Sequence, residues 1–484
     1  MKAKVLLIWL IAYLLGCLLG YILPVYGEMY LVLGVILCSA SLLVFRKTYI
    51  FAVIFALGVL AISVWNFQTR VGIFSAKNEL ASKNQILLQI RVDDLPQKAL
   101  HGDKVRFVIV GGHDRLVGSK FNGYLASSMG IHYGDVFDAE IKLGKYKSET
   151  KWRMIDMGVI GESSVNRYTK IGVDRGFWVR FKWVLLSFRQ GLNESISSLL
   201  PEREAGLASG IILGEKALVS AEMVQMLKVS GTTHIIALSG YNITVILGAI
   251  LLFRHKLSRR SAFFIPVSLI LIFTIMTGAA PSLVRAAIMG SMPLLARFLY
   301  RESDSFVSII FSATLMAMVN PMLPLFDIGF QLSFVAIAGI IYIAPIVGRA
   351  LSVLGDDIAG AFSETLGAQI ATVPLLSYYF GLISVISPIS NFIILGILPT
   401  CMALSFAMGL AGMVWHPLGV LLATPTYIIL SFVNNVISWS GSLSWASTTI
   451  QIENPWWILI CYLAIFDLWF VFRSRKLGPV GPAE

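Results

Sequence analysis

Long apolar runs, each about the length of a membrane-spanning helix, constrain the fold of this chain more than any other feature. Three come first, at about 5–24, 30–44 and 49–65, and nine more centre between residues 243 and 463. Only 13% of the 484 residues are charged, against about a quarter in soluble domains. The sequence therefore predicts a polytopic α-helical membrane protein, with about 11–12 transmembrane or re-entrant helices of ~20 residues each.

A polar segment interrupts the apolar runs after the third of them, over about 68–175. Apolar and polar residues alternate within it at 86–92, 104–110 and 136–143, which is typical of half-buried strands. About five such short strands predict a small inserted β-barrel, and the OB-fold is a good candidate.

The chain thus divides into four expected parts. They are three N-terminal transmembrane helices (1–67), an OB-like β domain (68–175), an amphipathic juxtamembrane helix (176–203) and a polytopic core (204–484).

Basic residues predict the orientation of these parts in the bilayer. Lys2, Lys4, Arg46 and Lys47 flank the first two apolar runs, and another basic cluster lies at 473–476. Cytoplasmic loops of membrane proteins are rich in Lys and Arg. We therefore expect both termini in the cytoplasm and the OB-like domain on the extracytoplasmic side of the membrane.

The inserted domain carries a surplus of positive charge. Residues 67–180 contain 18 Lys or Arg and 12 Asp or Glu, a surplus of 6. OB-folds hold single strands in basic grooves with stacking aromatic side chains. A solvated basic face is the alternative interpretation. The candidate DNA contacts fall in one short stretch: Lys142, Lys145, Lys147, Lys151, Trp152 and Arg153.

The stretch 230–243, which reads SGTTHIIALSGYNI, places polar side chains at the mouth of an apolar run. Polar groups at membrane depth usually face a bundle interior or water, because exposure to lipid is costly. Helix packing is the simpler explanation for His234 and for the Ser-Gly pair at 239–240.

This stretch resembles the signature of the ComEC family of competence proteins, the inner-membrane DNA-uptake channels of bacterial transformation. Family members read SGxxHLLAISG followed by Leu-His, whereas this chain has Tyr241 and Asn242 there, so the second histidine is absent. Further segments match in the family's order at 206–215, 278–289 and 320–334, and then at 369–391. The resemblance covers about 204–400.

The resemblance implies a set of residues that line the pore or support it. Arg285 could contact a phosphate, or it could form an ion pair with Glu215 or Asp327. Gln331 and Asn391 could line a polar path or join helices. The full set of candidates is Glu215, His234, Ser239, Asn242, Arg285, Asp327, Gln331, Gln369 and Asn391.

The sequence has no Gly-x-x-x-x-Gly-Lys-Ser/Thr motif, which would bind ATP and could drive transport. Importing DNA against an inside-negative potential costs ~2.3 kcal/mol per charge per 100 mV. The resemblance implies a cytosolic helicase-like motor and a DNA-receptor protein as partners, and a homo-oligomer is compatible with it.

Longer members of the family carry a C-terminal metallo-β-lactamase-like domain. This sequence shows none and has no His-x-His pair, so we expect a short form without cofactor, metal or enzymatic activity.

Transport of single-stranded DNA across the bacterial cytoplasmic membrane is therefore the predicted function. A transporter or flippase for a smaller anionic solute is the alternative, because Arg285 and the proline-interrupted stretch 362–413 fit it equally well. An intramembrane hydrolase using Ser239 and His234 is a third hypothesis, although no Gly-x-Ser-x-Gly elbow surrounds the serine.

Overall fold

The computed structural model describes residues 2–474, apart from 25–26, 44–47, 100–101, 127–129, 166, 216–218, 237–239, 252–257, 303, 352–354, 451–453 and 455. The chain forms two compact units. The first contains Met1–Phe188 and Ala249–Gln331, and the second contains Arg189–Gly248 and Leu332–Glu484. Each unit is described by itself.

Three helices open the first unit, and small residues bring them close together. A Cβ added to Gly58 would lie 2.5 Å from Sγ of Cys38, and one added to Gly16 would lie 2.6 Å from Cβ of Ser63. Glycine at such positions lets helix backbones approach closely, as in membrane bundles. The helices are α1 (Lys2–Ile22), α2 (Gly27–Leu43) and α3 (Thr48–Lys83).

Helix α3 continues to Lys83, beyond the boundary near 67 at which we expected the β domain to begin. Phe67 and Ala81 are buried, and Phe74 between them packs against the cores next to both. These three residues are spaced seven apart, which is two helical turns and places them on one face. The second half of α3 is thus an amphipathic helix that supports the inserted domain.

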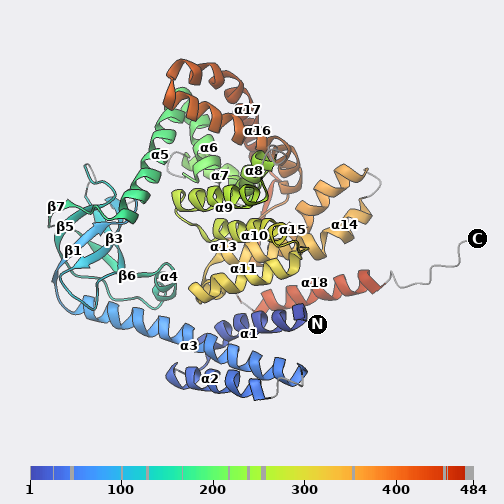
Figure 1. Cartoon of the computed structure of the whole chain (residues 1–484). Coiled ribbons are helices and arrows are strands. Elements are labelled where there is room, and N and C mark those ends of the chain that lie inside the picture. The colour runs from blue at the N-terminus through green and yellow to red at the C-terminus, as the bar shows by residue number, and fades with distance from the viewer. Residues whose placement is uncertain are drawn as a thin grey trace, which may run out of the picture. The chain divides into compact units, whose positions relative to one another are not determined.

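The inserted domain contains a β-sheet (Figure 1). It has seven strands in the order β6-β4-β3-β1-β5-β7, and β2 pairs with β3. All pairings are antiparallel except that of β4 with β6. Alternating residues of β1 (Leu88, Ile90 and Val92) are buried in the core. Phe107 stacks there on Phe121, with ring centroids 5.4 Å apart. The strands are β1 (Ile86–Val92), β2 (Gln97–Ala99), β3 (Gly102–Gly111), β4 (Lys120–Leu125), β5 (Asp135–Ile141), β6 (Val159–Ser164) and β7 (Tyr168–Val173), and the short helix α4 (Lys151–Asp156) precedes β6.

Helix α5 (Phe177–Leu199) follows the sheet, where we expected an amphipathic helix. Val179 and Leu186 are buried with Tyr133 of the β domain. Phe177 and Trp178 are both 74% exposed. One face of the first half of α5 therefore packs on loops of the inserted domain, and exposed aromatic side chains remain available to the membrane interface.

The remaining elements are mostly apolar helices. The first unit adds α9 (Arg259–Met276), α10 (Pro281–Phe298), α11 (Ser305–Val319) and α12 (Leu323–Phe326). The second unit contains α6 (Glu202–Leu213), α7 (Ala221–Val229), the 3-10 turn η1 (Thr233–Ile235), α14 (Ala344–Ala350), α15 (Asp356–Phe380), α16 (Ser387–Val414), α17 (His416–Ser442), α18 (Trp456–Ser474) and the short strands β8 (Leu382–Ser384) and β9 (Ser447–Thr449). Helices α8 (Gly240–Leu251) and α13 (Ile328–Tyr342) run from one unit into the other.

Within the described ranges, four helices are long and apolar enough to cross a membrane, or five if α13 and α14, bent by 45°, count as one span. Shorter apolar segments lie at Leu6–Ile22 in α1, Gly27–Ser41 in α2, Ser305–Val319 in α11 and Trp456–Val471 in α18. These helices fit a multi-pass membrane protein. Fewer spans meet the length criterion than the sequence predicted, because several apolar helices are shorter than the ~20 residues that a span needs.

The stretch 362–413, which prolines and several glycines interrupt in the sequence, is broken in the structure at one of these glycines. Pro374 and Pro399 lie inside the long helices α15 and α16. The break lies between these helices, where Gly381 ends α15 with φ +64° and β8 pairs with β9. A left-handed residue at a helix end is usually glycine, so Gly381 rather than a proline interrupts the apolar stretch.

Candidate functional site

The predicted pore residues divide between the two units. The second unit contains Glu215, His234, Asn242, Gln369 and Asn391, and the first contains Arg285, Asp327 and Gln331. Ser239 lies outside the described residues. Nowhere in the described part of the chain do three His, Cys, Asp or Glu side chains form a group that could hold a metal ion.

A polar cluster forms in the second unit where the start of the family signature meets the N-terminal end of α16. Gly231 adopts φ +71°, and a Cβ there would lie 2.5 Å from Cβ of Ser387. The Ser390 hydroxyl donates to the carbonyl oxygen of Ser230 at 2.8 Å. We call this cluster the signature junction, and its residues are Ser230, Gly231, Thr232, Gln369, Ser384, Ser387, Ser390 and Asn391.

Two predicted amides belong to the signature junction. Nδ2 of Asn391 donates to the Ser387 hydroxyl at 3.0 Å, and Nε2 of Gln369 donates to the carbonyl of Ser384 at 2.7 Å. Three buried atoms, Oε1 of Gln369, Oδ1 of Asn391 and Oγ of Ser384, have no hydrogen-bond partner among the described residues. Buried polar atoms normally have partners, so the junction has unused capacity for water or for a polar solute.

The other predicted residues of the second unit have different surroundings. Asn242 is buried, and its Nδ2 donates at 3.0 Å to the carbonyl of Ile211, in the last turn of α6. Last-turn carbonyls lack a partner within their own helix, so Asn242 joins α8 to α6. His234 is exposed on the turn η1.

Glu215 pairs with Arg189, whereas the sequence suggested Arg285 as its partner. Its Oε2 lies 2.6 Å from Nη2 of Arg189, and both side chains are largely buried. Sequence reasoning missed Arg189, because it appeared only as one of several basic residues on an amphipathic helix.

The motif DIGFQLSF at 327–334 begins with a helix cap in the first unit. The Asp327 carboxylate accepts from the amide of Phe330, as an N-terminal capping residue does. Nε2 of Gln331 donates to the carbonyls of Pro324 at 3.1 Å and Leu325 at 2.8 Å. These two side chains shape the turn between α12 and α13. Arg285 lies on α10 and is 8% exposed.

Helix α4 of the inserted domain packs against this same turn. Trp152 stacks on Phe326 with ring centroids 5.1 Å apart and an interplanar angle of 1°. Nδ2 of Asn320 donates to the backbone carbonyl and to Oδ1 of Asp156, both at 2.9 Å. We call this contact, made by Trp152, Asp156, Asn320 and Phe326, the α4 joint. It fixes the inserted domain to a family motif of the helical part of the same unit.

The α4 joint should be more stable in acid. Burial, followed by the negative charge of Asp327, raises the pKa of Asp156 from 3.8 to about 6. A carboxyl group whose pKa is higher in the folded state stabilises the fold at pH values below its pKa in the unfolded chain. This contribution is lost as the pH rises through the pKa of the folded state. Relative to an Asp156→Asn variant, the wild-type melting temperature should therefore fall between about pH 4 and pH 7. Thermal unfolding of the detergent-solubilised protein measures this. A difference between the two proteins that stays constant with pH would contradict it.

The predicted DNA contacts of the inserted domain do not share one environment. Lys142, Lys145, Lys147 and Arg153 are exposed. Lys151 lies with Nζ 5.2 Å from the Trp152 ring centroid. That ring is half-buried and stacked on Phe326, so its observed packing is structural.

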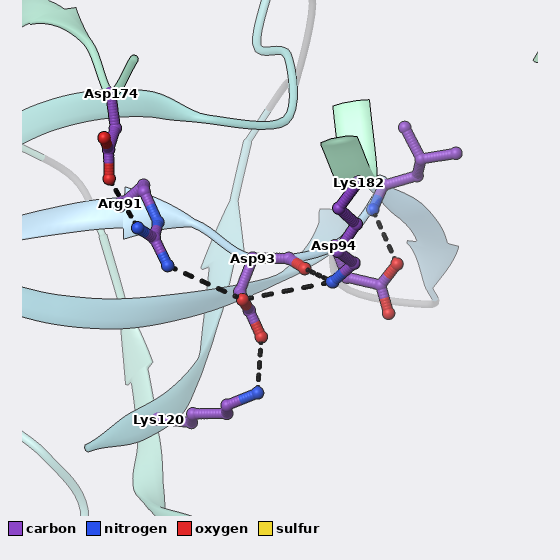
Figure 2. Close-up of polar contacts among 7 residues, drawn as sticks. Arg91, Asp93, Asp94, Lys120, Asp174 and Lys182 are labelled. Atoms are coloured by element: carbon purple, nitrogen blue, oxygen red, sulfur yellow. Dashed lines mark hydrogen bonds and ion pairs between the residues drawn. The ribbon is translucent and has the colours of Figure 1, made fainter. Parts of the chain in front are cut away.

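An ion network joins the sheet to α5, with Asp93 at its centre (Figure 2). Asp93 Oδ2 lies 2.7 Å from Nζ of Lys120, and the backbone carbonyl of Asp93 accepts from Lys182 of α5 at 2.6 Å. Arg91 pairs with Asp174 at 2.5 Å. A hydrogen bond from the amide of Gly176, followed by the Arg91 contact, lowers the pKa of Asp174. The network therefore holds the start of α5 against the sheet with charged groups that have partners.

Comparison with known proteins connects this architecture to a family. The family model described as Competence protein matches residues 211–475, which is more than half of the chain. ComE operon protein 3 of Bacillus subtilis (strain 168) is 28% identical over 311 residues, which cover 62% of this chain and 38% of that relative. The match thus spans well under half of the relative's length. No solved structure matches the chain. The extent of the family match shows that the chain belongs to the competence protein (ComEC) family.

Proposed function

We propose that this protein conducts single-stranded DNA across the bacterial cytoplasmic membrane during natural transformation. The observation that carries the proposal is the family match over 211–475, which includes the signature junction and the capped turn of the DIGFQLSF motif. The apolar helices support a place in the membrane, where we propose cytoplasmic termini and an extracytoplasmic inserted domain.

The inserted domain would receive the strand. Strands β1, β3 and β4 pair in succession, β5 returns to β1, and β6 lies parallel to β4. This order supports an OB-like, partly open Greek-key barrel, a type of domain that commonly binds single strands. The exposed Lys142, Lys145, Lys147 and Arg153 are our candidates for its outer DNA contacts.

The signature junction would form part of the path through the second unit. Its side chains are hydroxyls and amides, and three of its buried polar atoms have unused hydrogen-bonding capacity. Conduction requires binding that is strong enough for entry and weak enough for release. Neutral polar groups meet this requirement for a polyanion better than a row of cations, which would hold the phosphates.

We further propose that the chain is a conduit and not an enzyme. The energy for import would come from a cytosolic helicase-like motor, since the sequence has no P-loop. A DNA-receptor protein would deliver the strand, and copies of the chain could associate in the membrane.

Transformation of a naturally competent bacterium tests the proposal. We expect deletion of the gene to abolish transformation and the wild-type gene to restore it. Ser239→Ala should retain part of the flux, because a conduit does not depend on a nucleophile. Normal DNA uptake after deletion would favour a smaller anionic solute instead, and complete loss of function in Ser239→Ala at normal protein level would favour a hydrolase.

A further inference from the structure

A basic pocket lies on the inserted domain, and none of its lining residues is among the DNA contacts predicted from the sequence. Its volume is about 310 Å³. Helix α3, strand β3, the start of β4 and the turn between α4 and β6 contribute to its wall. The residues on which the argument rests are Lys77, Arg106, Ser119 and Lys120.

Three cationic side chains line this pocket, and its lining contains no carboxylate. Lys77 donates to the Ser119 hydroxyl at 2.9 Å, which leaves the O–H of Ser119 able to donate to a ligand. Lys120 contacts Asp93 at 2.7 Å, so part of its charge is already balanced. Nε of Arg106 is buried without a hydrogen-bond partner among the described residues. Buried donors normally have an acceptor, so this Nε is available to donate to a ligand oxygen.

We propose that this pocket binds one phosphate group of the incoming DNA strand, an inference that rests on the proposed function. Arg, Lys and hydroxyl donors are the groups that hold phosphate oxygens in protein–DNA complexes. In the proposed orientation the pocket would lie outside the bilayer. Lys77 follows Asn66, near the end of the apolar part of α3, by ~16 Å along the helix at ~1.5 Å per residue. The interfacial layer adds only about 5–8 Å beyond the hydrocarbon core, so a strand outside the bilayer reaches the pocket more readily than a lipid headgroup does.

Binding of a labelled oligo-dT strand to the full-length protein in zwitterionic nanodiscs tests the pocket, with the salt concentration varied. The variant Lys77→Gln with Arg106→Gln removes two cations of the pocket. Lys83→Gln with Arg167→Gln is the matched control, because it removes two exposed cations of the same domain. We expect the pocket variant to bind about tenfold more weakly or worse. Its salt dependence should lose a slope of about 0.7 per phosphate contact, and the control should stay close to wild type.

The outcomes separate the pocket from the function. If wild type binds and the pocket variant matches the control in affinity and salt slope, the pocket assignment is wrong and the proposed function stands. If wild type binds no single strand, the proposed function itself fails. Nanodiscs with anionic lipid form the second arm. A pocket variant that retains less anionic lipid but keeps its strand affinity would assign the pocket to a headgroup and overturn the proposal. Thermal unfolding shows whether the double variant is folded. The single Lys77→Gln variant repeats the binding test with a smaller change.

Discussion

Replacing Gly231 by alanine should lower transformation by about 100-fold or more. Its φ of +71° disfavours any residue with a Cβ, at ~1–2 kcal/mol. The new methyl group would also lie 2.5 Å from Cβ of Ser387, and overpacking adds about 1–3 kcal/mol. A total near 3 kcal/mol is about a hundredfold change in an equilibrium constant, so the signature junction should open or repack in most molecules.

The matched control for this variant is Gly396→Ala, on the same helix as Ser387. A Cβ on Gly396 meets nothing within 4 Å, so transformation should stay near wild type. Transformation frequency is compared at equal amounts of protein in the membrane. Normal transformation by Gly231→Ala at normal protein level would show that the close approach of the signature to α16 is not required.

Replacing Trp152 by alanine should destabilise the protein by about 3 kcal/mol, the low end for loss of a large aromatic side chain from a packed site. Trp152 stacks on Phe326, and a second aromatic contact, with Tyr21, lies at 5.3 Å. Trp152→Phe keeps an aromatic ring in place and should lose less than half as much, because an aromatic pair contributes ~0.5–1.5 kcal/mol beyond its buried area. The melting temperature of the purified protein measures both variants.

Trp183→Ala provides the control for the α4 joint. Trp183 lies on α5 and is 51% exposed, so its removal should change the melting temperature little in detergent. Equal effects of Trp152→Ala and Trp183→Ala would contradict a stabilising role for the joint. Transformation assays should rank the variants in the same order if the joint also positions the inserted domain for the strand.

Local sequence patterns predicted the elements better than the contacts between them. The alternation at 86–92 corresponds to β1, and the alternations at 104–110 and 136–143 largely correspond to β3 and β5. The extension of α3 was missed, although Phe67, Phe74 and Ala81 carry a seven-residue spacing. The apolar run ends near residue 67, so the boundary between α3 and the β domain was predicted too early in the sequence.

Contacts between distant segments could not be read from residue types. The partner of Glu215 is Arg189, and the partner of Asp156 is Asn320, yet nothing in the spacing of these residues marks them as neighbours. The requirement for glycine at position 231 could not be predicted either, because the side chain that leaves no room for a Cβ there is Ser387, far along the chain. The family resemblance placed these residues in motifs, and only the three-dimensional structure shows which motifs meet.

Photo-crosslinking during DNA uptake tests the central claim, conduction of the strand past the signature, most directly. A photoreactive residue replaces His234, which is exposed on the signature turn, and another replaces Leu421, which is 70% exposed on α17. In transforming cells given labelled DNA, we predict a covalent adduct with single-stranded DNA at position 234 and none at position 421. Efficient transformation without an adduct at 234, or with equal adducts at both positions, would contradict conduction past the signature.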